Sequence, residues 1–173
     1  MDCRGHGFTE VLCNPPNKTP TIPPSDISIL FISEAPPKSG QYFHDETQTD
    51  GLRTRIFRVL ASLGFQILGI KDLVSNHFYL VPTVKCPSQK NGVNHSPRKR
   101  VVNLCINRHL KREIQFIKPN AICLLGQTAL YGFSRLYSRI KCDRLYRRHG
   151  DIEQVTIDGK PTKILISYWP SER

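Results

Sequence analysis

One carboxylate stands where the chain could bind a ligand. Glu34 follows an apolar run at residues 27–32 that is rich in β-branched side chains, and such a run is typical of a buried strand in a parallel sheet. The two prolines at 36 and 37 cannot donate hydrogen bonds to a sheet, so the strand should end by Ala35. Open α/β sheets bind ligands at the carboxyl ends of their strands. Glu34 is therefore either a ligand-facing carboxylate or a solvated turn residue.

Two adjacent aromatic residues, Tyr42 and Phe43, interrupt the polar segment that follows, residues 38–51. Two adjacent aromatic residues are unusual in a segment of this composition. The simplest explanation is that one of these rings fills the core beneath the loop.

The six cysteines indicate thiols or metal ligands rather than disulfides, provided that the chain works in a reducing compartment. Cys123 lies inside an apolar run and is expected to be a buried hydrophobic residue. Cys142 lies in a basic stretch and receives no role.

The composition favours a polyanionic partner. The chain of 173 residues has 25 Lys and Arg against 14 Asp and Glu, a formal net charge of +11 and a pI near 9.6. Nucleic acid fits this excess first and an anionic membrane surface second. No apolar run approaches the length of a membrane span, and the first residues lack the layout of a signal peptide. We therefore expect a cytoplasmic monomer with no membrane partner.

Much of the positive charge falls in two stretches. Residues 85–118 contain nine Lys or Arg against one acid, and residues 135–148 contain six against one. A solvated surface would explain either stretch by itself, but in a chain of this net charge both favour contacts with phosphates.

The elements that position these residues alternate between strand and helix. Apolar spacing predicts helices at 52–63, 102–117 and 127–133, and strands at 27–32, 78–84, 121–126, 152–157 and 163–168. Asp50 or Thr54 could cap the first helix and Gly64 could end it, while Arg53, Arg55 and Arg58 occupy its polar face. The alternation predicts a three-layer α/β/α fold with a central, mainly parallel four-stranded sheet. Residues 1–26 form an extended arm and residues 27–173 a single domain.

Four stretches in this order resemble motifs of the uracil-DNA glycosylase superfamily, especially its iron–sulfur-containing family 4 branch. They are residues 31–37 (FISEAPP), 79–87 (YLVPTVKCP), 105–126 (CINRHLKREIQFIKPNAICLLG) and 168–171 (YWPS). The resemblance implies a DNA base-excision repair glycosylase that flips uracil or a related deaminated base into a pocket and hydrolyses its N-glycosidic bond. The alternative is a catalytically weak or inactive protein of the same fold that binds DNA.

The resemblance also assigns residues to the site. Glu34 becomes the catalytic carboxylate, and Phe43, or alternatively Tyr42, becomes the ring on which the base stacks. The implied base-binding set is Ala35, Tyr42, Phe43, Pro82, Asn91, Trp169 and Ser171. The implied DNA-binding set is Lys90, Arg98, Lys99, Arg100 and Arg173.

Two positions depart from the family pattern. The family's base-reading Asn falls on Pro82, and the His of its second motif falls on Trp169, whose indole N–H cannot relay a proton. Asn91 or Asn94 could replace the lost Asn. A shifted base preference or a weak activity therefore becomes more plausible than strict uracil specificity. Relatives continue past the second motif, so a chain ending at Arg173 is expected to be trimmed or to lack their DNA-inserting loop.

The branch holds its cluster with four cysteines. Cys86 and Cys105 match two of them, and Cys3 and Cys13 are the remaining candidates, although they lack the family's Cys-x-x-Cys spacing. A Cys₄ set suits either a [4Fe–4S] cluster, which the resemblance favours, or zinc. Such a centre would fasten residues 1–26 to the domain. Free thiols without metal are the alternative.

Overall fold

The computed structural model of the chain describes residues 24, 26–37, 42–87, 89–90 and 93–170, without the side chains of residues 89, 90, 93 and 94. The strands are β1 (Ile29–Ser33), β2 (Phe78–Pro82), β3 (Gln89–Lys90), β4 (Val93–Asn94), β5 (Ala121–Leu125), β6 (Ile152–Ile157) and β7 (Lys160–Ser167). The helices are α1 (Gly51–Ser62), α2 (Ile70–Ser75), α3 (Lys99–Cys105), the π-helical η1 (Ile106–Leu110), α4 (Lys111–Ile117), α5 (Gln127–Leu136) and α6 (Leu145–Arg148).

The main sheet has the strand order β2-β1-β5-β7-β6. β2, β1, β5 and β7 are parallel, and β6 pairs with β7 in the antiparallel sense. Ser33 lies opposite Pro82 and Leu125 lies opposite Ser167. The carboxyl ends of the four parallel strands therefore meet at one edge of the sheet, where ligands are expected.

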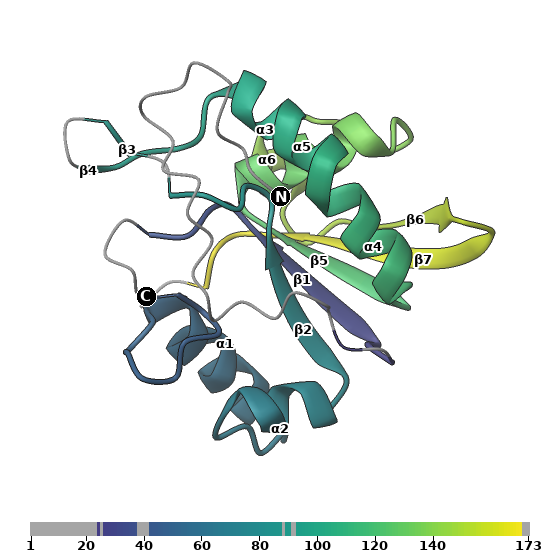
Figure 1. Cartoon of the computed structure of the whole chain (residues 1–173). Coiled ribbons are helices and arrows are strands. Elements are labelled where there is room, and N and C mark those ends of the chain that lie inside the picture. Colours follow the sequence, from purple (N-terminus) through teal and green to yellow (C-terminus); the bar gives the residue numbers. More distant parts are fainter. Residues whose placement is uncertain (1–23, 25, 38–41, 88, 91–92, 171–173) are drawn as a thin grey trace.

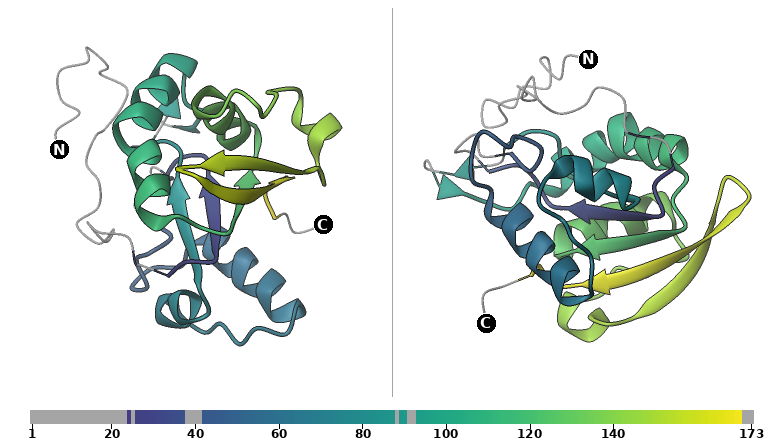
Figure 2. Two further views of the ribbon diagram at one scale, coloured as in Figure 1. Left: turned by 90° about the vertical axis from the view of Figure 1, so that its right-hand side faces the viewer. Right: turned by 90° about the horizontal axis from the view of Figure 1, so that it is seen from below.

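Alternation along the strands divides the core between the two faces of the sheet. Leu30 and Ile32 of β1 point into one cluster together with the buried side chains of α3, η1, α4 and α5. Phe31 contributes to a second cluster on the other face, which includes Ile56 and Leu60 of α1 and Leu73 of α2. Helices therefore cover both faces, as Figures 1 and 2 show, and the expected three-layer α/β/α architecture is confirmed.

The sheet has five strands rather than the expected four. The 152–157 and 160–167 segments form a hairpin whose second strand joins the parallel core, so the first becomes an antiparallel edge. Asp158 and Gly159 make the turn with φ angles of 47° and 82°, the positive values that two-residue hairpin turns require. β7 begins at Lys160, three residues before its expected start, because Pro161 is tolerated opposite Thr156 near the turn.

The expected helices are present with shifted ends. α1 occupies residues 51–62, capped at its start by Asp50, whose side chain accepts the backbone N–H of Arg53. The helix expected at 102–117 begins at Lys99 and passes through the π-helical stretch η1. α5 continues to Leu136, three residues beyond its expected end. The short helices α2 and α6 were not predicted.

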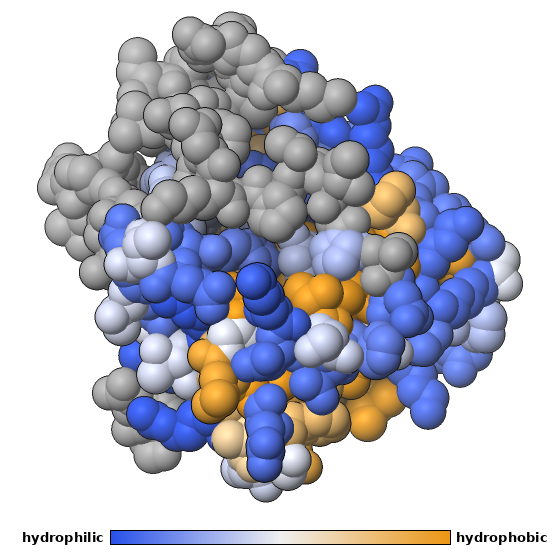
Figure 3. Space-filling model, turned by 60° about the horizontal axis from the view of Figure 1, so that its bottom comes forward, coloured by the Kyte–Doolittle hydropathy of each residue, from blue (hydrophilic) through white to orange (hydrophobic). Residues whose placement is uncertain are grey.

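Part of the sheet face beside α1 carries an open apolar groove of about 1090 Å³. Its lining includes Phe31 of β1, Leu125 of β5 and Leu165 of β7, together with exposed Leu63 and Tyr168. Figure 3 shows hydrophobic residues gathered on this side of the molecule. Within the described residues, no helix is both long and apolar enough to cross a membrane.

Candidate active site

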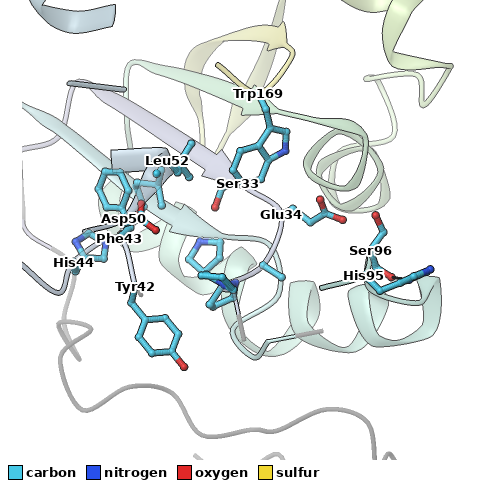
Figure 4. Close-up of a pocket in the computed structure, with 16 residues that line it drawn as sticks. Ser33, Glu34, Tyr42, Phe43, His44, Asp50, Leu52, His95, Ser96 and Trp169 are labelled. Atoms are coloured by element: carbon cyan, nitrogen blue, oxygen red, sulfur yellow. Dashed lines mark hydrogen bonds between the residues drawn. The ribbon is translucent and has the colours of Figure 1, made fainter. Parts of the chain in front are cut away.

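A cavity of about 430 Å³ opens at the carboxyl edge of the sheet. Its lining residues come from the end of β1 and the segment after it, from β2, from the loop leading into α1 and the first turn of that helix, from the loop before α3 and from the segment after β7. They are Ser33, Glu34, Ala35, Pro36, Pro37, Tyr42, Phe43, His44, Asp50, Gly51, Leu52, Leu80, Pro82, His95, Ser96 and Trp169. Figure 4 shows Phe43, His44 and Asp50 grouped on one side of the cavity and Glu34 on the opposite side.

Glu34 lies directly after β1, and its carboxylate and backbone are both fixed by hydrogen bonds. Thr128 Oγ1, in the first turn of α5, donates a hydrogen bond of 2.8 Å to Glu34 Oε1. The backbone carbonyl of Glu34 accepts the N–H of Val84 at 2.9 Å. The pairing of β1 with β5 places the start of α5 beside the end of β1. The expectation that Glu34 faces a ligand pocket thus agrees with its position, and its catalytic role stays a prediction.

Phe43 fills the core and also reaches the cavity, and its role as a stacking ring stays a prediction. Its side chain is 7% exposed and packs in the second core cluster, edge-on to Phe57 at a centroid separation of 6.5 Å. It also lines the cavity. Tyr42 is half-buried in the same wall, and burial raises the pKa of its phenol, with the nearby thiol of Cys86 as the second cause.

Arg53 holds the backbone that carries these two rings. Its guanidinium donates to the carbonyls of Phe43 at 2.8 Å and Asp45 at 2.9 Å, and also to those of Tyr42 and Gln48. The sequence placed Arg53 on the polar face of a helix, where a solvated role is usual. The loop folds back over that face, so one side chain satisfies carbonyls that have no strand or helix partners.

Trp169 follows β7 and packs against the turn between β5 and α5. Gly126 has a φ of 95°, and a Cβ added there would lie 2.5 Å from Trp169 Nε1. The indole therefore fits only because position 126 lacks a side chain. Pro82 stands at the end of β2 in the cavity wall, and its carbonyl accepts Lys85 Nζ at 2.7 Å.

His44 and Asp50 line the cavity although sequence reasoning gave neither a binding role. His44 Nε2 donates to the carbonyl of Leu80 at 2.9 Å, and its ring stacks on Tyr79 with centroids 4.9 Å apart. Burial lowers the pKa of His44, and the positive charges of Lys85 and Arg53 lower it further. The contact with Leu80 spans 36 positions, so no local pattern could have revealed it.

Asp50 is 6% exposed, and its Oδ1 accepts the backbone N–H of Arg53 at 2.6 Å. Burial raises the pKa of this carboxyl, while the hydrogen bond from Arg53 opposes the rise. An Asp directly before an apolar helix predicts the cap, and that prediction is confirmed. Asp50 also lines the cavity, because the loop whose carbonyls Arg53 binds folds over the start of α1.

The family model described as "Uracil DNA glycosylase superfamily" matches residues 19–173. The chain is therefore a member of the uracil-DNA glycosylase superfamily. Its members are generally DNA glycosylases, so DNA is the partner and a glycosylase-like function the activity class that membership supports. No curated protein sequence matches this superfamily member significantly.

The remaining base-binding and DNA-binding candidates of this superfamily member divide by position. Ala35 lines the cavity, whereas Asn91, Ser171 and Arg173 lie outside the described residues. Arg98, Lys99 and Arg100 are exposed at the start of α3, and Lys99 Nζ lies 5.5 Å from the ring centroid of Tyr131. Lys90 belongs to β3, but its side chain is not described.

The six cysteines differ in burial and in whether the structure describes them. Cys86 and Cys105 are 1% and 3% exposed, in the loop after β2 and at the end of α3. Cys3 and Cys13 lie outside the described residues, and within the described part no group of three or more His, Cys, Asp or Glu side chains could hold a metal. Cys123 is buried as expected, and burial raises its pKa to about 12. Cys142 is exposed.

Proposed function

We propose that this protein is a DNA base-excision repair glycosylase that acts as a cytoplasmic monomer. It flips a deaminated base, uracil or a related base, into the cavity and hydrolyses the N-glycosidic bond. The observation that carries the proposal is the placement of Glu34, fixed by Thr128, across a cavity from Phe43 in a member of this superfamily.

The geometry suits a dissociative hydrolysis. The sugar gains positive charge as the base departs, and a fixed carboxylate lowers the energy of that charge and holds the attacking water. Glu34 is the group for both tasks, because the Thr128 hydrogen bond occupies one oxygen and leaves the other for water. Phe43 supplies the ring against which the flipped base lies.

Two further lining residues, Pro82 and Trp169, predict a weak preference for uracil. The side chain of Pro82 can neither donate nor accept a hydrogen bond at the base edge. The side chain of Trp169 has a single donor, its indole N–H, and no acceptor. A departing uracil carries negative charge, so fewer donors mean less stabilisation of the transition state. Hypoxanthine and xanthine are the further deaminated bases that we include.

Arg98, Lys99 and Arg100 are proposed to contact the DNA backbone. All three side chains are exposed, and they follow directly the loop in which His95 and Ser96 line the cavity. Cations at this rim would hold phosphates beside the flipped nucleotide, and binding would weaken as salt rises.

We further propose that Cys86 and Cys105 are two of four ligands to a [4Fe–4S] cluster, with zinc as the alternative. Two buried thiols from the segment after β2 and the end of α3 suit half of such a donor set, and Cys3 and Cys13 would complete it. The group would fasten the N-terminal arm and take no part in hydrolysis. Purified protein with broad absorbance near roughly 400 nm would support the cluster over zinc.

The test is base release from single- and double-stranded oligonucleotides that contain one uracil, hypoxanthine or xanthine. Wild-type protein should generate alkali-labile abasic sites, and E34Q, which keeps the shape and the contact with Thr128, should reduce the rate by about 100-fold or more. Folded wild-type protein that releases none of these bases would refute the enzymatic proposal.

A second function is favoured by one specific observation, the Pro82 and Trp169 pair in the cavity wall. A protein without the usual base-reading groups could bind DNA or damaged bases without cutting. Salt-dependent DNA binding with no base release, equal for wild type and E34Q, would establish this alternative.

A further inference from the structure

The cavity differs in charge from the protein that surrounds it. The chain carries a formal net charge of +11. Among the described residues that line the cavity, however, there are two carboxylates, Glu34 and Asp50, and neither Lys nor Arg. A basic exterior suits DNA phosphates, whereas an acidic cavity favours a cation. The side chains that line the cavity are thus acidic, while the charge of Arg53, which does not line it, acts on Asp50 from outside.

Asp50 brings more than a helix cap needs. Ser or Asn caps a helix as well as Asp does. The carboxylate of Asp50 accepts the backbone N–H groups of Arg53 and Leu52, and two such bonds leave some of its lone pairs unused. An ionised carboxylate accepts hydrogen bonds and donates none. Asp50 lies on the Phe43 side of the cavity, where a stacked base would present its edge, and not beside Glu34 (Figure 4).

His44 adds no positive charge to this side of the cavity. Its Nε2–H donates to the carbonyl of Leu80, while Nδ1 is buried away from the cavity and has no hydrogen-bond partner among the described residues. Burial lowers the pKa of His44, so the ring is neutral at pH 7. The Phe43 side of the cavity therefore offers the carboxylate of Asp50 as the acceptor for a ligand that carries donors.

The aromatic residues of the wall also suit a cation. Tyr42, Phe43 and Trp169 all line the cavity, and the face of an aromatic ring attracts positive charge. A flat, cationic ligand with N–H groups along one edge would suit both the rings and the carboxylates.

We infer that this pocket accepts a cationic N-alkylated purine, of which N7-alkylguanine in DNA is the defining example. The inference rests on the proposed glycosylase function and assigns the same site a further class of base. Alkylation at N7 gives the purine ring a positive charge and leaves N1–H and the 2-amino group as adjacent donors. One carboxylate can accept both donors, and Asp50 is the residue placed to do so.

Hydrolysis of such a base needs no stabilisation of a negative leaving group. The C1′–N9 bond breaks and its electron pair enters the ring, which turns the cation into a neutral base. Water adds through its oxygen to C1′, Glu34 takes the proton, and the products are neutral N7-alkylguanine, an abasic hemiacetal and a proton passed to solvent. The absence of His at position 169 is then no handicap, because no charge develops on the departing base for that residue to stabilise.

The experiment measures base release from duplexes with one 7-methylguanine, uracil or hypoxanthine, using short incubations and a no-enzyme blank for spontaneous loss. Wild-type protein should release 7-methylguanine above the blank. D50N keeps the cap but exchanges one acceptor for a donor. It should lower 7-methylguanine release by about tenfold or more relative to hypoxanthine release.

D72N is the matched control. Asp72 also accepts backbone N–H groups at a helix start, those of Leu68 and Gly69, and does not line the cavity. The D72N substitution removes the same negative charge as D50N and should leave the release rates of all three bases unchanged. D50S, which also retains a capping side chain, serves as the second variant if D50N melts early, and it should show the same loss.

Each outcome decides between the two claims. Release of uracil or hypoxanthine without 7-methylguanine overturns this inference and leaves the proposed function standing. Release of 7-methylguanine alone supports the inference and overturns the preference for deaminated bases, and no release of any base overturns both. Release of 7-methylguanine that D50N and D50S leave at the wild-type rate overturns Asp50 as the reader.

Discussion

Thr128 and Glu34 lie 94 positions apart in the chain, and the hydroxyl of one donates to the carboxylate of the other at 2.8 Å. The contact exists because β1 and β5 run parallel and end at the same edge of the sheet. It links the first turn of α5 to the candidate catalytic group, so the orientation of Glu34 depends on a residue that no local motif includes.

Removal of this hydroxyl should slow catalysis without preventing folding. We expect T128V to lower kcat for base release by about tenfold, since a hydrogen bond to a charged group stabilises by roughly 1.5–3 kcal/mol and part of it orients Glu34. T128S keeps the hydroxyl and should retain most of the rate. Single-turnover assays with both variants measure the difference, and equal rates for T128V and wild type would show that Glu34 needs no such support.

The loop that carries Phe43 depends on Arg53 in the same way. R53M removes the guanidinium that donates to four loop carbonyls, two of which, those of Tyr42 and Asp45, keep a backbone N–H donor. It should lower the free energy of unfolding by about 2 kcal/mol and raise KM more than it lowers kcat, because the stacking ring loses its fixed position. R58M on the exposed face of the same helix is the control. Urea unfolding and steady-state kinetics provide the two measurements. An R53M protein with the same free energy of unfolding and the same KM as R58M would contradict the prediction.

Local patterns were sufficient for elements whose signals lie within a few residues. The prolines after Ala35 mark the end of β1, and the apolar stripe gives α1 within one residue at each end. α2 has no such signal because its start is fixed from elsewhere: Glu46 Oε1 accepts the N–H of Ile70, 24 positions away. The extra strand of the sheet likewise depends on β7 joining β5.

The candidate site divides along the same line. Glu34 could be predicted because it terminates a strand, and Phe43 because it stands out in a polar loop. Arg53 and His44 could not, since both acquire their partners only when distant segments meet. Asp50 could be predicted as a helix cap. Its position in the cavity wall could not, because that position depends on the loop that folds over α1.

The contact between Gly126 and Trp169 can be tested with fluorescence, because Trp169 is the only tryptophan of the chain. G126A places a Cβ 2.5 Å from the indole and forces an alanine into a φ of 95°. It should cost about 1–3 kcal/mol of stability and shift the tryptophan emission. G64A has a similar φ of 92° with open space around it, so it should lose stability but keep the emission. Identical spectra for G126A and wild type would place the indole elsewhere.

Stability should fall as the pH drops below about 6.5, the ordinary pKa of histidine. Burial lowers the pKa of His44 and of His109 in the folded protein, so the unfolded chain binds protons first. Above the ordinary pKa both histidines are neutral in the folded protein and in the unfolded chain, so they do not lower the free energy of unfolding. Between the ordinary and the folded pKa each such histidine costs up to about 1.4 kcal/mol per pH unit. Urea unfolding of wild type between pH 7 and pH 5 should therefore show a decline.

Substitution of one histidine isolates its share of this decline. H44Q retains a side-chain N–H that can donate to the carbonyl of Leu80 but cannot titrate, so its stability should fall less steeply with decreasing pH than that of wild type. H109Q removes the second contribution, and the double variant should be the flattest of the four proteins. A slope for H44Q equal to that of wild type would mean that His44 takes up a proton as readily in the folded protein as in the unfolded chain, and so is not held neutral beside the cavity.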